Sequence, residues 1–308
     1  MSEERNEIMF GESSNVVTKK HMKASTKRKI GNIIAYTILI LMSIIWIFPF
    51  ICIVLQSFRC ESTWMTGYII PQKWGFDNYV RLFNETKFFK WFTNTTVIAL
   101  FTCVIQTFMV LCMAYTLSRL RFKGRKFLMN AMLVLGMFPG MLTMIILYRV
   151  LADLKIFGDT GLTQTMSVPG LILVYTASSA MGYHVAKGFF DTIPKSLDEA
   201  ARVDGANRAQ VLFKIILPLA KPIVIYTVLT AFMAPWGDFM FARYIAHGSS
   251  AGMNVAVGLQ TFITKDNIGS YYTMFCAGGV VVAIPITLLF LFLQKYYVEG
   301  VTGGAVKG

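Results

Sequence analysis

Long stretches without charge constrain this chain more than any other feature of its sequence. A transmembrane helix needs about 20 consecutive, mostly apolar residues. Six stretches meet this length, and Lys221 is the one charged residue within them: 30–58, 91–118, 127–148, 160–186, 215–237 and 272–294. The sequence therefore predicts an all-α membrane protein with six transmembrane helices.

The composition agrees with a membrane protein and argues against a basic soluble one. Hydrophobic residues make up 55% of the 308 residues, charged residues 15%, and the mean hydropathy is +0.57. Soluble domains carry about 25% charged residues. The net charge of +13 is distributed between the apolar stretches instead of forming one patch. We therefore expect the lipid bilayer as a partner and no nucleic acid.

The distribution of Lys and Arg predicts the topology, because basic residues favour the cytoplasmic side. Segments 1–29, 119–126, 187–214 and 295–308 carry 7, 5, 5 and 2 of them, 19 in all. The alternate segments 59–90, 149–159 and 238–266 carry 5, 2 and 2, 9 in all. Both termini are therefore predicted to be cytoplasmic, and 1–29 to be a basic cytoplasmic segment. The first apolar stretch is too long for a signal-peptide core, so we expect a retained span.

Few residue patterns in this chain suggest catalysis or cofactor binding. The five cysteines form no C-x-x-C pair, which predicts no metal site. No G-x-x-x-x-G-K-[ST] motif occurs, so ATP has to be bound by another chain. We interpret His184 as a packed or interfacial residue and Lys221 as a side chain that reaches the inner interface. Trp236 to Asp238 either lines the outer mouth or ends a helix. The sequence predicts no enzymatic activity and no resident cofactor.

The stretch between the fourth and fifth apolar runs, 190–215, predicts two short helices around a glycine. Ser196 and Glu199 have the spacing of a capping box. Gly205 suits a left-handed position after a helix, and Asn207 with Gln210 repeats the capping pattern. Small and charged residues on such a helix suggest docking to another protein. An ordinary helical loop fits the spacing equally well.

This stretch resembles a known family. Glu199-Ala-Ala-Arg-Val-Asp-Gly205, with Ile216-Leu-Pro218 downstream, is similar to the EAA loop of ABC-importer permeases. In that family the loop forms a coupling helix that docks in a cleft of the ATPase. The resemblance implies a type I ABC importer permease fold for residues 30–308, with the coupling loop at 190–215. The residues implied to contact the ATPase are Ser196, Glu199, Ala200, Ala201, Asp204 and Gly205.

Two further segments resemble the maltose-type permeases of this family. Gly300 to Gly308 is similar to a tail that reaches between the ATPase subunits, which implies a cytoplasmic tail at 295–308. Its implied contacts are Thr302, Gly303, Gly304, Val306, Lys307 and Gly308. Val255 to Gln260 is similar to an outward loop that contacts the sugar-binding protein, with implied contacts Val255, Gly258, Leu259 and Gln260.

The resemblance implies an importer subunit in the bacterial cytoplasmic membrane. Its expected partners are a homologous second permease, two ATPase subunits that hold ATP and magnesium, and an extracytoplasmic binding protein. The expected cargo is a sugar, with maltose or maltodextrins first. The alternatives are a secondary transporter, which needs carboxylates inside the membrane, and a membrane enzyme. The side chains proposed to line the substrate path are Asn94, Thr95, Gln106, Tyr175 and Ser179.

Overall fold

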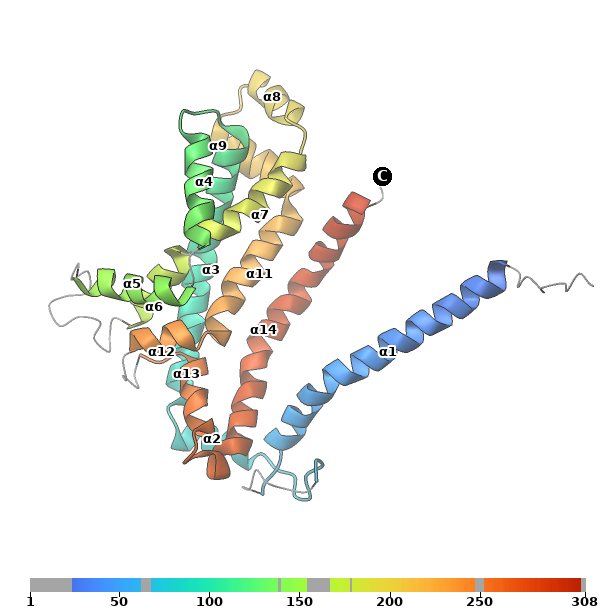
Figure 1. Cartoon of the computed structure of the whole chain (residues 1–308), viewed down its shortest axis with the longest axis vertical. Coiled ribbons are helices and arrows are strands. Elements are labelled where there is room, and N and C mark those ends of the chain that lie inside the picture. The colour runs from blue at the N-terminus through green and yellow to red at the C-terminus, as the bar shows by residue number, and fades with distance from the viewer. Residues whose placement is uncertain are drawn as a thin grey trace, which may run out of the picture. The chain divides into compact units, whose positions relative to one another are not determined.

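The computed structural model describes residues 24–61, 68–137, 140–153, 167–177, 179–246 and 252–305, and these residues are almost entirely helical (Figure 1). They form two compact units, 1–51 and 52–308. The helices are α1 (Ala24–Ser57), α2 (Asp77–Glu85), α3 (Phe88–Arg119), α4 (Arg125–Gly136), α5 (Gly140–Asp153), α6 (Ser167–Ala177), α7 (Ser179–Thr192), α8 (Ser196–Val203), α9 (Arg208–Gln210), η1 (Val211–Ile216), α10 (Leu217–Leu219), α11 (Lys221–Gly237), α12 (Met240–Ala246), α13 (Val255–Gln260), η2 (Thr261–Ile263) and α14 (Ile268–Ala305).

Three of these helices are long and apolar enough to cross a membrane, within the part of the chain that the structure describes. The spanning segments are Arg28–Ser57 in α1, Phe88–Arg119 in α3 and Ile268–Tyr296 in α14. A fourth span is obtained if the bent pair Arg208–Leu219 and Lys221–Gly237 is counted as one. The prediction of an all-α membrane protein is therefore confirmed, whereas the count of six spans is not.

The third predicted span is divided into two helices, and the fourth contains residues of α6 and α7. The apolar stretch 127–148 holds α4 and α5, and α4 ends at Gly136 before α5 begins at Gly140. The sequence between them contains Pro139, and proline and glycine both disfavour a continuous helix. The stretch 160–186 likewise holds α6 and part of α7. Helix α4 packs on α7, and Figure 1 shows α5 running in a different direction from α4.

The fifth predicted span is bent at its N-terminal end. The segment that leads into it, which includes the π-helix η1, meets α11 at 88°. Pro222 occupies the first turn of α11 and has no amide to donate to the preceding turn. The helix therefore turns at Ala220, and the straight part of the span begins at Lys221, whose side chain is exposed.

Helix α3 is the centre of the second unit. It contacts α6, α7, α11 and α13, and α11 packs in turn on α14. Two hydrophobic clusters lie along it. The first surrounds Trp91, Trp236 and Met274, and the second surrounds Tyr115, Phe190 and Val211. The second cluster includes Ala201 of α8, so the predicted docking helix is packed onto the same core as the spans.

Polar contacts attach the segment before α13 to α3. The Asn94 amide donates to the carbonyl of Met253 at 2.9 Å, and the Val255 amide donates to the Thr95 hydroxyl at 2.8 Å. Gly258 of α13 lies against Trp91, so close that an added Cβ would come within 2.1 Å of the indole ring. A glycine is therefore required at this contact.

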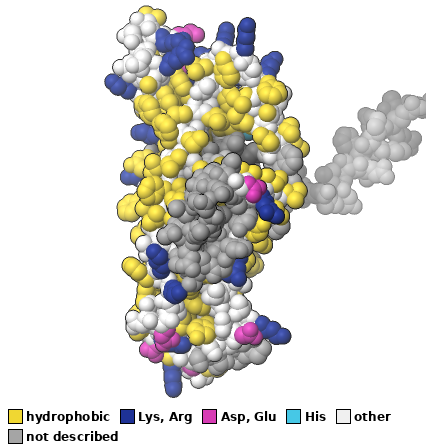
Figure 2. Space-filling model, turned by 90° about the vertical axis from the view of Figure 1, so that its left-hand side faces the viewer, with side chains coloured by type: hydrophobic (Ala, Val, Ile, Leu, Met, Phe, Trp, Pro, Cys, Tyr) yellow, Lys and Arg dark blue, Asp and Glu magenta, His cyan; other side chains and the backbone are white. Residues whose placement is uncertain are grey.

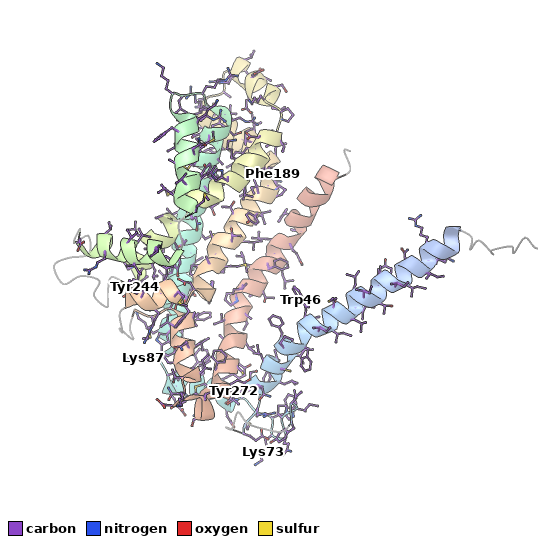
Figure 3. All side chains as sticks on the ribbon, in the orientation of Figure 1. Trp46, Lys73, Lys87, Phe189, Tyr244 and Tyr272 are labelled. Carbon is purple, nitrogen blue, oxygen red and sulfur yellow. The ribbon has the colours of Figure 1, made fainter. Side chains whose placement is uncertain are left out.

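Helix α1 exposes apolar side chains in every direction (Figure 3). Every described side chain from Arg28 to Ile51 is exposed, and Trp46 is 75% exposed. Only lipid or another protein can cover a helix that is hydrophobic all round. The first unit therefore has the surface of a membrane-spanning helix.

We predict that Gly258→Ala destabilises the second unit by about 1–3 kcal/mol, because the new methyl group overpacks the contact with the buried Trp91 ring. Thermal unfolding of the purified protein in detergent measures the effect. Gly279→Ala on α14 is the matched control, because an added Cβ there meets nothing within 4 Å. Equal unfolding temperatures for the two variants would contradict the packing argument.

Candidate functional site

The predicted docking helix exists as α8, and its end is fixed by backbone geometry. Gly205 has φ = +83°, the left-handed conformation that the sequence predicts. Its amide donates to the carbonyl of Arg202 at 3.1 Å, and the Ala206 amide donates to the carbonyl of Ala201 at 2.9 Å. These two bonds form a Schellman motif, which satisfies the last carbonyls of the helix.

One of the two predicted capping boxes is present. Asn207 accepts from the amide of Gln210 at 2.9 Å, and the Gln210 side chain accepts from the Asn207 amide at 2.8 Å, which confirms that prediction. The predicted box at Ser196 is wrong. The helix begins one residue earlier than expected, with Lys195 already in the right-handed helical region, and no side chain caps it. Ser196 therefore occupies a helical position, where its hydroxyl does not cap the first turn.

A buried ion pair joins α8 to the end of α3. Nε of Arg119 lies 3.0 Å from Oδ2 of Asp198, and the two side chains are 3% and 13% exposed. Nη2 of Arg119 also donates to the carbonyl of Ile193 at 2.8 Å. Burial raises the pKa of Asp198, although Arg119 beside it acts in the opposite direction. From the sequence, Arg119 was interpreted only as one of the basic residues that determine topology, and its ion pair with Asp198 was not predicted.

The neighbouring residue of α3 makes a second attachment. The Ser118 hydroxyl donates to Asp191 near the end of α7 at 2.6 Å, and Lys187 donates to the same carboxylate at 2.6 Å. The last turn of α3 therefore binds both the end of α7 and the beginning of α8. Helix α8 is therefore attached to a helix that is long and apolar enough to cross a membrane.

The outer face of α8 is exposed and carries most of the predicted coupling residues. Ser196, Glu199 and Ala200 are exposed on α8, as are Asp204 and Gly205 after it. Ala201 is the exception. It is buried in the hydrophobic cluster that also contains Val211 and Ile216, so it lies away from the exposed face of α8, and its predicted contact with an ATPase stays a prediction.

Val203 was missed by the sequence reading. It is 88% exposed, although valine is one of the side chains most often buried. Its spacing of three and four residues from Ala200 and Glu199 places all three on one helix face. That helical spacing was the signal available in the sequence.

The predicted binding-protein contacts are mostly buried. Val255, Gly258 and Leu259 lie in the core against α3 and α14, while Gln260 is half-buried. They cannot contact a partner directly in this structure, because the tight packing of α13 covers them. The exposed residues that follow, Ile263, Lys265 and Asp266, present the free surface of this region.

The proposed path residues fall into different environments. Asn94 and Thr95 are buried and hold the loop before α13, and buried Tyr175 is hydrogen-bonded to Asp238. For these three side chains the structure argues against lining an open path, because their polar groups are already engaged. Gln106 is half-buried on α3, and its role in lining the path stays a prediction. The side chain of Ser179 lies outside the described residues.

The other predicted residues are placed as follows. Asp238 ends α11 and accepts from the amide of Phe241 at 3.1 Å, which favours the helix-end interpretation of that turn. His184 is half-buried, with its ring centroid 4.0 Å from that of Tyr183. In the predicted tail, the backbone is helical through Thr302, Gly303 and Gly304. Val306, Lys307 and Gly308 lie outside the described residues.

Comparisons with known proteins agree on one family. The model of the binding-protein-dependent transport system inner membrane component matches residues 110–303. The maltodextrin transport system permease protein MdxG of Bacillus subtilis is 36% identical over 93% of this chain and 100% of its own length. The galactooligosaccharides transport system permease protein GanQ of the same organism is 33% identical over 92% and 98%.

A solved structure has a similar fold. It is the crystal structure of a bacterial ABC transporter involved in the import of the acidic polysaccharide alginate. The TM-score is 0.71 at 23% identity, over 90% of this chain and 99% of that one. The similarity shows the fold of an ABC transporter permease, and the matched family is a transport component and not an enzyme.

We predict that Arg119→Gln frees α8 from the end of α3, because it leaves the buried Asp198 carboxylate without a countercharge. Breaking a buried ion pair typically costs 3–5 kcal/mol. Trypsin should then cut faster at Lys195, Arg202 and Arg208, as measured by mass spectrometry of timed digests. Arg81→Gln is the control, since its pair with Glu85 is exposed and worth below about 1 kcal/mol. Unchanged cleavage around α8 would count against the attachment.

Proposed function

Because this chain belongs to the family of binding-protein-dependent transport system inner membrane components, we propose that it is the permease subunit of an ATP-driven importer of a sugar or oligosaccharide. The observation that carries the proposal is α8. It is a short helix with an exposed face, and it is joined to the end of a membrane-spanning helix by a buried ion pair. Such a helix is suited to receive a movement from a partner and pass it to the span.

The docking surface is the face of α8 that carries Glu199, Ala200 and Val203. It combines an exposed apolar group, a small residue that permits close approach, and a carboxylate. An ATPase subunit that covers this face buries Val203 and pairs Glu199 with a cation. Gly205 follows the last turn of α8. Because it has no side chain, the end of the helix stays accessible to a partner.

Movement of α8 has a short route into the membrane. Arg119 transmits it to α3, and Val211 and Ile216 transmit it to the bent segment before α11. The 88° bend and the π-helix η1 are interruptions of regular helix, where a change of angle breaks few hydrogen bonds. We propose that closure of the ATPase subunits rotates α8 and opens the transport path to the extracytoplasmic side of the membrane.

The chain provides one half of such a path. We propose a homologous second permease beside it, two ATPase subunits that hold ATP and magnesium, and an extracytoplasmic binding protein that delivers the cargo. We place both termini in the cytoplasm of a bacterial cell, on the basis of the Lys and Arg distribution. A second alginate transporter structure, which was solved with its periplasmic protein, has a TM-score of 0.60 and supports the fold of this half.

For the cargo we propose maltodextrin first. The maltodextrin transport system permease protein MalD of Streptococcus pneumoniae is 34% identical over 92% of this chain, close to the value for MdxG. Galactooligosaccharide permeases are nearly as similar. Direct measurement of uptake of both sugars by the assembled transporter distinguishes them. A secondary transporter gains no support, because α3, α11 and the span of α14 contain no Asp or Glu.

The coupling assignment predicts a graded series at Gly205. Its φ of +83° strains any residue with a Cβ by roughly 1 kcal/mol or more, while no neighbour within 4 Å adds a clash. Gly205→Val should leave the protein expressed and inserted but abolish sugar uptake and weaken ATPase pull-down. Gly205→Ala should be milder, and Glu199→Lys should resemble the valine variant. Gly188→Val is the control, because this glycine also meets no neighbour but lies outside α8. Full uptake by Gly205→Val would reject the assignment.

The topology predicts opposite accessibility for two exposed positions. In a cysteine-free background, Asp266→Cys should react with a membrane-impermeant thiol reagent added to intact cells. Lys123→Cys, in the turn after α3 and away from the docking face of α8, should react only after the membrane is permeabilised. Both positions are exposed in the structure, so burial does not limit labelling of either one. The reverse pattern would invert the proposed topology.

A further inference from the structure

A cavity lies at the turn between α3 and α4, apart from the docking face of α8. Its volume is about 600 Å³, and its lining residues are Arg121, Phe122, Gly124, Arg125, Lys126, Phe127 and Met129. The turn follows the last residue of the α3 span, so it lies at the membrane surface in the proposed orientation. Figure 2 shows Lys and Arg side chains gathered at this end of the second unit.

The charge of the cavity is entirely positive. Arg121, Arg125 and Lys126 line it, and no Asp or Glu does. Within the described residues, no ion pair or side-chain hydrogen bond involves Arg121 or Lys126, and Nε of Arg125 is buried without a hydrogen-bond partner. Asp191 is the carboxylate whose charge Arg125 faces, and it is already bonded to Lys187 and Ser118. The cavity is therefore suited to an anion.

The backbone adds donors at the same place. Gly124 has φ = +91°, and α4 begins after it without a side-chain cap. Among the described residues, no carbonyl accepts from the amides of Lys126 and Phe127 in this first turn. The N-terminal turn of a 12-residue helix carries partial positive charge and free N–H groups, which bind phosphate well.

Apolar surface continues from the cavity along α4. Phe122 and Phe127 flank the cations, and Phe127 is 78% exposed. None of the described side chains of α4 is buried, and its outer residues include exposed Leu133, Val134 and Leu135. A free phosphate needs no such surface, whereas an acyl chain attached to a phosphate does.

We propose that this cavity binds an anionic phospholipid, with its phosphate at Arg121, Lys126 and the first turn of α4 and an acyl chain along Phe127 and the apolar face of α4. Basic pockets beside membrane helices bind such headgroups. The neighbouring groove of about 530 Å³ is a poorer site, because Asp198 and Glu199 line it together with its cations. The inference rests on the proposed membrane orientation but not on the cargo or the ATPase.

Native mass spectrometry of the full-length chain in detergent tests the proposal, with phosphatidylglycerol, phosphatidylcholine or inorganic phosphate added. The wild type should retain phosphatidylglycerol in preference to phosphatidylcholine. Arg121→Gln with Lys126→Gln should weaken retention about fivefold for each removed charge. Lys123→Gln is the matched control, because Lys123 lies in the same turn but outside the cavity lining and should leave retention unchanged.

A further variant and a competition experiment distinguish a bound phospholipid from bound inorganic phosphate. Phe127→Ala should weaken phosphatidylglycerol retention without a change in inorganic phosphate binding. Displacement of the lipid by inorganic phosphate at comparable concentration would instead assign the site to free phosphate. If Lys123→Gln and the double variant lost phosphatidylglycerol retention equally, general surface charge would explain the effect and the proposal would be overturned. Equal unfolding temperatures of all variants confirm that each is folded, and no transport activity is required for any arm.

Discussion

The Arg119–Asp198 ion pair is the interaction on which the rest of the assembly depends. A span has to end in a polar residue at the membrane surface, and here the residue that ends α3 also holds α8. Separating the two charges costs free energy, because both side chains are almost buried and an unpaired charge at this position is not hydrated. The position of α8 relative to the span is therefore determined by electrostatics as well as by apolar packing through Ala201.

The other end of α3 is attached by neutral hydrogen bonds. Asn94 and Thr95 bind backbone groups of Met253 and Val255, and Gly258 packs closely on Trp91. One straight helix thus joins the segment before α13 to the docking helix α8, with side-chain contacts at both ends. The irregular elements lie beside it, at η1 and at the bend before α11. A rigid helix next to a bend is an arrangement in which rotation at one end repositions the other.

The sequence predicted features that depend on local chemistry and missed those that depend on distant contacts. The span in α3 follows from an uncharged stretch, and the conformation of Gly205 follows from the absence of a Cβ. The division of the stretch 127–148 into α4 and α5 was not predicted, although Pro139 lies there, because an apolar stretch with a proline fits one kinked span as well as two helices. The bond from Val255 to Thr95 joins residues 160 positions apart, and nothing in either local sequence indicates it.

Exposed apolar groups distinguish two kinds of contact at the end of the molecule that carries α8. Val203 lies on a short helix with charges of both signs, Glu199 and Asp204 together with Arg202, so this surface offers little net attraction to an anionic bilayer and suits a protein partner. Phe127 lies beside cations with no carboxylate in the cavity lining, where the same surface is attracted. The charge beside each apolar group thus distinguishes the turn proposed to face lipid from the helix proposed to face a protein. The Arg119–Asp198 pair lies in the groove between these two surfaces and joins them, so both proposed contacts depend on the same attachment.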